Sequence, residues 1–542
     1  MGMLLWSKIK SFPRHLWILL VIICLGAFLR TYNLHEWMEF RGDQVRDSYL
    51  VDRVVSGESA WPLLGPYMYN SGSSKEMFYH LGPAYYYFQI ISAKIFGSYP
   101  DKMAYPDVFF SILSIPLFYL FLRVYFRRNL SLGIVLVYAI SSYFIHYSRF
   151  AWNSNLIPFF VLLFLFSLHK ILVANEKTHW LWVAVFGFAW GIGFQLHAIT
   201  MLLFSIIAFF SFLFSMKNNP KIFSRWVVIV LIFITLNGGQ IVNEVNTNFG
   251  NTKRLLNFSS QGGGASESKF ALFGKDIACH IEANSFFLSS YGSNNCSYGI
   301  LNFLPSISDG GISKITKNWT YWSVLLLSLI FSGISYFLLV YCSRKEKERE
   351  GLFFLRLIAL YAGINFLIMV PLSVEKFSDL RYLTPVFFVP FVMLGLVAKV
   401  VYEKFSKKFI ILIVAILILL VSSNFIDISS EAKVLLEKNR TCSSHFTTLG
   451  EVEAVADYIV KDSGGEKNIQ IGGYRELLVA VDPLEYLLKK RGISPIKVAT
   501  EKYLSSSDSP AFFISCRSKF GELYDYEKIG NIYVYNVVNI NK

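Results

Sequence analysis

The chain has few charged residues. Only 16% of its 542 residues are Asp, Glu, Lys or Arg, whereas 54% are hydrophobic. A soluble globular domain carries about 25% charged residues, so the composition excludes that class, and the mean hydropathy of +0.45 agrees. The net charge of +14 does not indicate nucleic acid, because the basic residues cluster between apolar runs without interleaved aromatic residues. We therefore predict an integral membrane protein.

Several familiar patterns are also missing. No glycine-rich phosphate loop follows a predicted strand, and no Ser-His-Asp order or nucleotide-sugar Asp-x-Asp motif stands out. No internal repeat is visible, which weakens the case for an inverted-repeat transporter. The chain holds 6 cysteines and no zinc-type Cys/His spacing.

What the chain has instead is a series of apolar runs close to the ~20 residues that cross a bilayer as a helix. We place eleven spans at 15–29, 106–126, 131–148, 155–173, 180–196, 198–215, 226–243, 321–342, 352–372, 382–402 and 409–427. Lys and Arg concentrate in alternate connections, so the positive-inside rule puts the N-terminus in the cytoplasm. Three segments, 30–105, 244–320 and 428–542, then face outward.

The outward segments differ in character. Segment 30–105 is predicted to hold an amphipathic surface helix over Gln44–Ser56 and a second helix from Gly82-Pro83 to Phe96. Segment 244–320 has Gln261-Gly262-Gly263-Gly264 at its centre and is predicted to be a flexible lid or groove wall. The tail, 428–542, alternates helix and strand patterns with strands at 468–471, 495–498, 511–516 and 532–537. The expected fold is thus a polytopic α-helical membrane domain, 1–427, followed by a small extracytoplasmic α/β domain, 428–542.

The cysteines fall into three pairs by location. They are Cys24 and Cys342 in or beside spans, Cys279 and Cys296 in one outer segment, and Cys442 and Cys516 in the tail. The first pair is predicted to be apolar filler. The other two pairs lie on the oxidising side and predict two disulfides.

Asp43 is the main candidate for chemistry. It follows the first span and opens the amphipathic stretch. A carboxylate beside the hydrocarbon is disfavoured unless it is paired or wetted, so it is a functional candidate by default. Its structural alternative is an N-cap of the surface helix, and both roles can hold at once.

Several blocks of the sequence resemble the integral-membrane glycosyltransferases of the GT-C type, in the protein-mannosyltransferase-like branch that includes the lipid A aminoarabinose transferases. The blocks are Leu29-Arg30 through Asp43-Gln44-Val45-Arg46, His80-Leu81-Gly82-Pro83-Ala84-Tyr85-Tyr86-Tyr87, Tyr147-Ser148-Arg149-Phe150-Ala151-Trp152-Asn153, Gly193-Phe194-Gln195-Leu196-His197 and Arg381-Tyr382-Leu383-Thr384-Pro385. The resemblance extends over residues 15–405 and depends on the order of the blocks. It implies a sugar donor on a polyprenyl phosphate, an extracytoplasmic active site, and an acceptor hydroxyl activated by the first outer carboxylate, here Asp43.

The chain departs from that family in three places. The family has Asp-Glu where this chain has Asp43-Gln44, and some members have an acidic residue where it has Asn153. Aminoarabinose transferases carry Glu-Lys where this chain has Tyr79-His80. This last difference puts the metal site of the aminoarabinose transferases, and their lysine contact to phosphate, in doubt for this chain. No metal ligands are therefore assigned, and a requirement for a divalent metal stays open.

Transfer of a sugar from a lipid phosphate needs a base, groups that stabilise the departing phosphate, and an apolar groove. Asp43 suits the first role. Arg381 and Arg149 are candidates for donor-phosphate binding, with interfacial snorkelling and an aromatic-belt anchor as their respective alternatives. Further substrate-binding candidates are His80, His197, Asp47, Tyr85, Asn153 and Glu76. Their alternatives are satisfied structural histidines, solvated or paired charges (Asp47 with Arg46 or Arg53) and an aromatic interface belt.

The sequence therefore predicts an inverting glycosyltransferase of the plasma (inner) membrane, acting on a glycan, lipid or protein acceptor in the cell envelope. The missing Asp-x-Asp motif favours a lipid-linked donor. Two other classes stay open: a lipid-linked sugar flippase or transporter, and a surface-polysaccharide polymerase or ligase.

Overall fold

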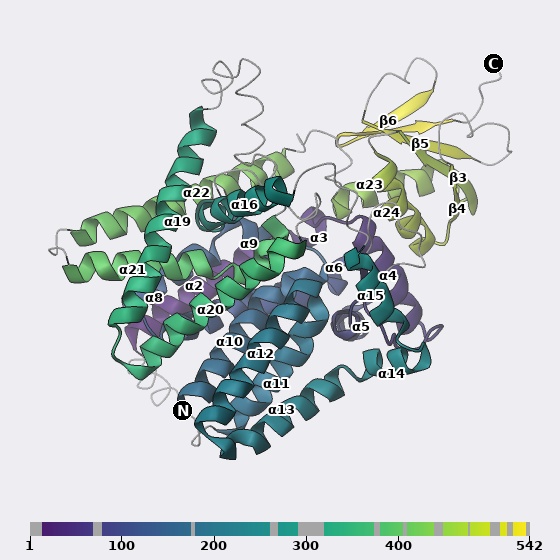
Figure 1. Cartoon of the computed structure of the whole chain (residues 1–542). Coiled ribbons are helices and arrows are strands. Elements are labelled where there is room, and N and C mark those ends of the chain that lie inside the picture. The colour runs from purple at the N-terminus through teal and green to yellow at the C-terminus, as the bar shows by residue number, and fades with distance from the viewer. Residues whose placement is uncertain are drawn as a thin grey trace, which may run out of the picture.

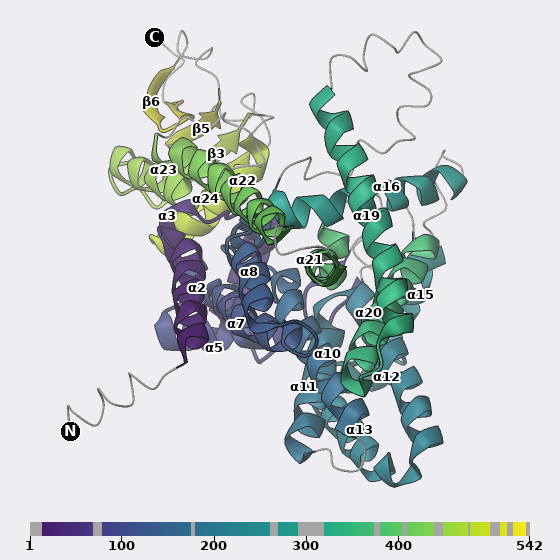
Figure 2. The same ribbon diagram turned by 90° about the vertical axis from the view of Figure 1, so that its left-hand side faces the viewer.

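The structure, a computed structural model, describes residues 13–68, 79–174, 179–260, 269–290, 319–372, 380–404, 409–437, 448–474, 477–498, 510–516 and 524–537. Most of these residues are helical, and the helices form a bundle with a small β-sheet domain at one end (Figures 1 and 2). The first described helix, α2, begins at the end of the bundle away from the sheet and ends beside it.

The first half of the bundle follows the predicted spans closely. Its helices are α2 (Arg14–Thr31), α7 (Tyr105–Leu122), α8 (Arg128–Ala139), α9 (Ser142–Tyr147), η2 (Asn153–Leu156), α10 (Ile157–Ala174), α11 (Trp180–Leu196), α12 (Ala198–Asn218), η4 (Pro220–Ile222), α13 (Phe223–Leu236) and α14 (Gly238–Asn246). The predicted span 131–148 is interrupted between α8 and α9, and the span 226–243 is bent by 64° between the helix pair η4–α13 and α14.

The second half contains α15 (Gly250–Ser260), α16 (Lys269–Ser289), α19 (Trp319–Lys345), α20 (Arg349–Leu372), η6 (Leu380–Val386), α21 (Val389–Lys404) and α22 (Ile410–Leu436). Where it is described, the segment predicted to be a lid is thus largely helical. Helix α22 also continues past residue 427, so the domain boundary there stays a prediction.

The described residues contain eight helices that are long and apolar enough to cross a membrane, or nine if the bent pair is one span. The chain is therefore a multi-pass membrane protein. The eleven predicted spans include α8 and α11, which are shorter apolar helices, so the exact number of spans and their orientation stay predictions.

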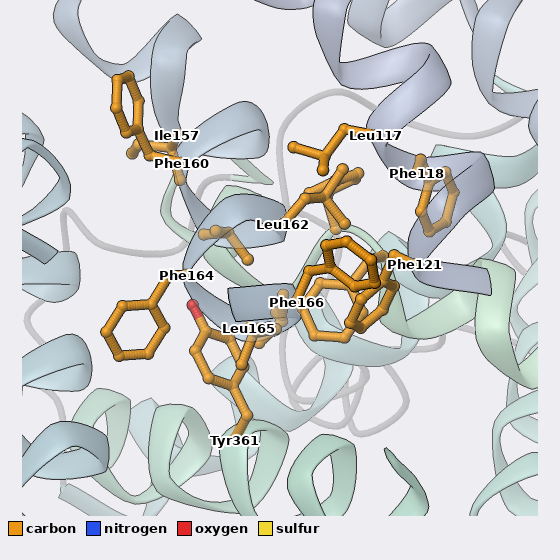
Figure 3. Close-up of a cluster of buried hydrophobic side chains, with 14 of the residues drawn as sticks. Leu117, Phe118, Phe121, Ile157, Phe160, Leu162, Phe164, Leu165, Phe166 and Tyr361 are labelled. Carbon is orange, nitrogen blue, oxygen red and sulfur yellow. The ribbon is translucent and has the colours of Figure 1, made fainter. Parts of the chain in front are cut away.

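Large apolar side chains fill the centre of the bundle. One buried cluster includes Phe118 and Phe121 of α7, Phe160 and Phe164 of α10, and Tyr361 of α20. The α7 rings and these two α10 rings lie on opposite sides of Leu162 and Leu165 (Figure 3). All five aromatic side chains are almost completely buried. This cluster joins α7, α10 and α20, which are distant from one another in sequence.

The outer segment, residues 30–105, holds α3 (Leu34–Trp37), α4 (Gly42–Val55), the two-stranded hairpin of β1 (Tyr67–Met68) and β2 (Tyr79–His80), α5 (Ala84–Phe96) and α6 (Pro100–Met103). Both predicted helices are confirmed. Helix α5, however, buries one face in the bundle core, including Tyr85, Tyr86 and Ile90, so it does not simply lie on a surface.

The tail domain has a five-stranded sheet with strand order β4-β3-β5-β7-β6. Its elements are α23 (Leu449–Asp462), β3 (Asn468–Gly473), α24 (Leu478–Lys490), β4 (Ser494–Val498), β5 (Ala511–Ser515), β6 (Asp525–Ile529) and β7 (Ile532–Asn536). Strands β4, β3 and β5 are parallel, and β7 and β6 continue the sheet antiparallel. The predicted α/β character is confirmed, and β6 is the strand that the sequence patterns missed.

The tail domain packs on the outer segment through α23 and α24 (Figure 1). Phe40 and Val45 share one apolar core with Leu449 and Val452 of α23. Around this core, the tail residue Tyr486 donates a hydrogen bond to Asp52 of α4 at 2.9 Å. The tail domain and helix α4 are therefore parts of one packed unit.

The cysteines agree with the predictions as far as they are described. Cys24 and Cys342 are free thiols, whereas Cys279 and Cys516 are each in a disulfide. Their predicted partners, Cys296 and Cys442, lie outside the described residues, so the pairing itself stays a prediction.

The shared core makes a prediction about stability. Phe40 is completely buried and its ring meets that of Tyr486 edge-on, with centroids 5.5 Å apart. We expect Phe40→Ala to cost about 3–5 kcal/mol because it leaves a cavity in this core, and to lower the thermal unfolding temperature in detergent. Phe109→Ala is the control, since Phe109 is 56% exposed. Equal unfolding temperatures for the two variants would contradict the shared core.

Candidate active site

Asp43 lies in the first turn of α4. The helix begins at Gly42, and Arg41 is its N-cap residue. The predicted N-cap role of Asp43 is therefore wrong: the side chain of Gln44 accepts the hydrogen bond of the Arg41 backbone N–H, at 3.3 Å. The Asp43 carboxylate instead stands on the surface with 48% of its side chain exposed, at a helix end where the dipole favours a negative charge.

Arg46 joins this carboxylate to a second one. Its Nη1 lies 2.8 Å from Asp43 Oδ1, and its Nε lies 2.7 Å from Asp47 Oδ1. The guanidinium carbon is also 4.6 Å from the centre of the Tyr67 ring. Burial alone would lower the pKa of Arg46, but the Asp47 and Asp43 carboxylates outweigh it and the pKa is raised. Arg46 is a permanent cation that orients Asp43.

Asp47 is the buried partner in this pair. It accepts a hydrogen bond of 2.7 Å from the hydroxyl of Tyr86 in α5. Burial raises the pKa of Asp47, and Arg46 opposes the rise. The predicted pairing with Arg46 is confirmed, while the alternative of a solvated charge is wrong because only 1% of Asp47 is exposed.

Tyr85 extends the same network inward. Its hydroxyl donates to Asp107 Oδ2 at 3.1 Å, and Asp107 Oδ1 accepts the backbone N–H of Trp152 at 3.1 Å. Tyr85 is completely buried, which does not favour its predicted contact with substrate. Sequence reasoning missed Asp107, although a carboxylate inside a predicted span is a signal that could have found it.

His80 lies in strand β2 of the hairpin, where its ring contacts that of Tyr67. Its Nδ1 lies 3.1 Å from the carbonyl of Gly65, and its backbone exchanges two hydrogen bonds of 2.8 Å with the side chain of Asn251 in α15. Burial lowers the pKa of His80, and the charges of Arg254 and Arg46 lower it further against the Gly65 contact. Two guanidinium groups therefore act on this one imidazole, and Arg254 was not predicted.

Asn153 and His197 form a second group. The side-chain amide of Asn153 donates to the carbonyl of Leu196. His197 follows directly as the N-cap of α12, where its Nδ1 accepts the N–H of Ile199 at 3.2 Å. The His197 ring is also 5.7 Å from that of Tyr382 in η6. Both residues thus serve the junction of α11 and α12, and their substrate role stays a prediction.

Arg149 is engaged with the end of α2. It donates to the carbonyls of Leu29 at 2.9 Å and Tyr32 at 2.7 Å, and its guanidinium lies 5.7 Å from the Trp37 ring. Burial lowers the pKa of Arg149 to about 10, with Glu431 opposing the shift. These contacts are those of a helix C-terminal cap beside an aromatic anchor. They use two of the five guanidinium N–H donors, and the donor-phosphate role of Arg149 stays a prediction.

Two predicted residues cannot be placed in this geometry. Arg381 belongs to η6, but its side chain is outside the described part of the structure, and Glu76 lies outside the described residues altogether. Within the described ranges, no group of three or more His, Cys, Asp or Glu is arranged to hold a metal ion. The need for a divalent metal stays open.

A cavity of about 970 Å³ lies between the end of α2, the second half of α5 and the start of α7. Its walls are largely apolar and include Phe88, Ile91, Phe109 and Phe110. None of its lining residues belongs to α4, so it is separate from the Asp43 group. The shape and walls suit a long hydrocarbon chain.

Comparisons with known proteins fit this architecture. Residues 80–237 match the family model of the dolichyl-phosphate-mannose-protein mannosyltransferases. The chain resembles the crystal structure of ArnT from Cupriavidus metallidurans bound to undecaprenyl phosphate, with 13% identity over 97% of this chain and 98% of that one and a TM-score of 0.50. It also resembles the apo oligosaccharyltransferase of Archaeoglobus fulgidus, with 10% identity over 95% of this chain and 71% of that one and a TM-score of 0.51.

The chain has the fold of the GT-C membrane glycosyltransferases. The resemblance predicted from its sequence blocks is confirmed. A comparison with curated protein sequences gives no match. The family match includes His80, Asn153 and His197 but begins after Asp43, so the place of Asp43 in the GT-C fold comes from the structure rather than from the family match.

His80 makes a testable prediction about pH. Because its pKa is lowered in the folded protein, the unfolded chain takes up a proton as the pH falls through about 6.5 that the folded protein does not. The stability that depends on neutral His80 is therefore present above this pH and is lost below it. We expect the thermal unfolding temperature of the wild type to fall more between pH 7 and pH 5.5 than that of His80→Gln. His179→Gln is the control at an exposed histidine, and parallel pH curves for wild type and His80→Gln would contradict the burial effect.

Proposed function

We propose that this protein is an inverting glycosyltransferase that moves a sugar from a polyprenyl phosphate to an acceptor hydroxyl on the outer side of the membrane. The observation that carries the proposal is the exposed Asp43 carboxylate, held by Arg46 at the start of α4 in a chain with the GT-C fold. The match to the mannosyltransferase family supports the same class of reaction.

In the proposed reaction, the acceptor oxygen attacks the anomeric carbon of the donor sugar from the face opposite to the phosphate. The new carbon–oxygen bond forms while the bond to the phosphate oxygen breaks, and the phosphate leaves with the electron pair. Asp43 takes the proton of the acceptor hydroxyl. A single displacement of this kind inverts the configuration at the anomeric carbon.

The departing phosphate needs cationic partners. Arg254 of α15 and Arg46 of α4 both act on His80 electrostatically, and α15 packs against strand β2 of the hairpin. Guanidinium groups bind phosphate well because they donate two parallel hydrogen bonds. We therefore assign the phosphate of the donor to Arg254, with Arg46 beside it, and keep Arg381 as the further candidate predicted from sequence.

Two observations support a lipid-linked donor. The ArnT structure that shares this fold is bound to undecaprenyl phosphate. In this chain, the cavity between α2, α5 and α7 is large and apolar, as a polyprenyl chain requires. We propose a polyprenyl-phosphate sugar as donor and a glycan, lipid or protein hydroxyl as acceptor.

The first test is Asp43→Asn. We expect a loss of about 10²- to 10⁴-fold in turnover, the contribution of one general base, because the amide cannot accept the proton. Label transfer would be measured with purified protein in lipid, using radiolabelled polyprenyl-phosphate sugars and a cell-envelope extract as acceptor. The fold should be kept, since the side chain is exposed and nearly isosteric.

Glu58→Gln is the matched control, because Glu58 is an exposed carboxylate just beyond the C-terminal end of α4. Turnover by Asp43→Asn at the wild-type level would exclude Asp43 as the base. Donor that is bound or translocated without any transfer by the wild type would favour the transporter class instead.

A second test concerns the phosphate. We expect Arg254→Gln to raise the apparent KM for the donor about tenfold, the effect of losing one charge-assisted hydrogen bond. Lys253→Gln is the control. Lys253 directly precedes Arg254, its side chain is exposed, and the substitution removes the same charge. Arg381→Gln in the same assay tests the sequence-based assignment. Unchanged donor kinetics in Arg254→Gln would place the phosphate elsewhere.

A further inference from the structure

A second cavity, of about 870 Å³, lies at the other end of the bundle. It is formed where α7 and α21 end and where α8 and α22 begin, and α8 contacts both α21 and α22 (Figure 1). Because the ends of four apolar helices meet here, the cavity lies at the depth where a bilayer changes from hydrocarbon to head groups. Asp43 and the tail domain are beside the opposite end of α7.

Cationic side chains dominate the lining of this cavity. The lining includes Arg123, Arg127, Arg128 and Lys399 and one carboxylate, that of Glu403. Lys399 is paired with Glu346 outside the lining, at 3.8 Å. With that pair set aside, three guanidinium groups against the Glu403 carboxylate leave a net positive field, and low-dielectric walls concentrate such a field. The cavity is therefore suited to an anion.

Glu346 compensates Lys399, but among the described residues Arg123, Arg127 and Arg128 form no ion pair. The Arg127 guanidinium lies 5.3 Å from the centre of the Tyr402 ring, which is not a charged partner. Arg127 is also the N-cap of α8, Arg128 is its first residue, and the first turn of α8 has no acidic residue. Cations at a helix N-terminus are disfavoured by the dipole, so an anion between them would stabilise this helix end.

The opposite wall of the cavity is apolar. It is made by the first two turns of α22, with Ile410, Ile413, Val414 and Leu417. Ile410 and Val414 are 37% and 47% exposed. A soluble anion would leave this wall bare, whereas an amphipathic anion would cover it and place its charge among the arginines.

We propose that this cavity binds an anionic glycerophospholipid, with the head-group phosphate among Arg123, Arg127 and Arg128 and an acyl chain along α22. A zwitterionic lipid fits less well, because its own cation would meet the three arginines. Small-molecule sites have volumes of about 300–1,000 Å³, and this cavity is within that range. The site does not depend on the proposed reaction, because it shares no residue with the Asp43 group.

The experiment measures lipid retention by native mass spectrometry. The full-length protein is placed in nanodiscs of phosphatidylcholine with a minor fraction of phosphatidylglycerol, and the ratio of the two lipids that stay bound is recorded. The wild type should retain phosphatidylglycerol preferentially. The double variant Arg127→Gln/Arg128→Gln should lose at least about tenfold of that preference, because each basic residue near an anionic lipid contributes to binding.

The matched control is Lys221→Gln/Arg225→Gln, which removes the same charge at the connection between α12 and α13, outside the cavity. It should retain phosphatidylglycerol as the wild type does. An equal loss in both double variants would mean that overall basicity, and not this cavity, attracts the lipid, and would overturn the proposal.

A second pair of variants tests the apolar wall independently of charge. Val414→Trp should displace the acyl chain and lower phosphatidylglycerol retention, whereas Ile411→Trp should not, since Ile411 is 74% exposed and lies outside the cavity lining. The proposal is wrong if the wild type shows no preference for phosphatidylglycerol, if neither cavity variant changes it, or if inorganic phosphate displaces the lipid.

Discussion

The candidate site depends on one ion-pair arrangement, in which Arg46 bridges the exposed Asp43 and the buried Asp47. A buried carboxylate without a partner costs several kcal/mol, so Arg46 must stay where Asp47 holds it. The Tyr86 hydroxyl fixes Asp47 in turn. Arg46 therefore holds the surface carboxylate in one place, which is the preorganisation that the proposed general base needs.

Helix α4 is held at both ends by parts of the chain that are far away in sequence. Near its start, the Gln44 side chain donates to the carbonyl of Ala151 at 3.1 Å. Toward its end, Asp52 accepts hydrogen bonds from Tyr486 and Lys490 of the tail domain at 2.9 Å and 2.8 Å. The tail domain thus supports the helix that presents Asp43, although it contributes no residue to the proposed chemistry.

Sequence patterns predicted the local elements well. Helix α11 has the bounds of its predicted span, 180–196, because a continuous apolar run is a local signal. Strand β6, Asp525–Ile529, was missed since it is an exposed edge strand with mostly polar residues, and such a strand has no apolar alternation to detect. Asp43 was predicted to be the N-cap, whereas it is the second residue of α4. Capping depends on backbone geometry, and the helix already begins at Gly42, whose φ is 39°.

The sequence by itself determined that this is a multi-pass membrane protein with an α/β tail, and its motif order indicated the GT-C fold. These features follow from composition and from short-range periodicity. Only the tertiary structure decided which charges meet. Arg254 and His80 are separated by a long stretch of chain, and so are Tyr85 and Asp107 from the Trp152 backbone. Packing of helices against each other brings such groups together, and no local pattern in the sequence records which pairs will be in contact.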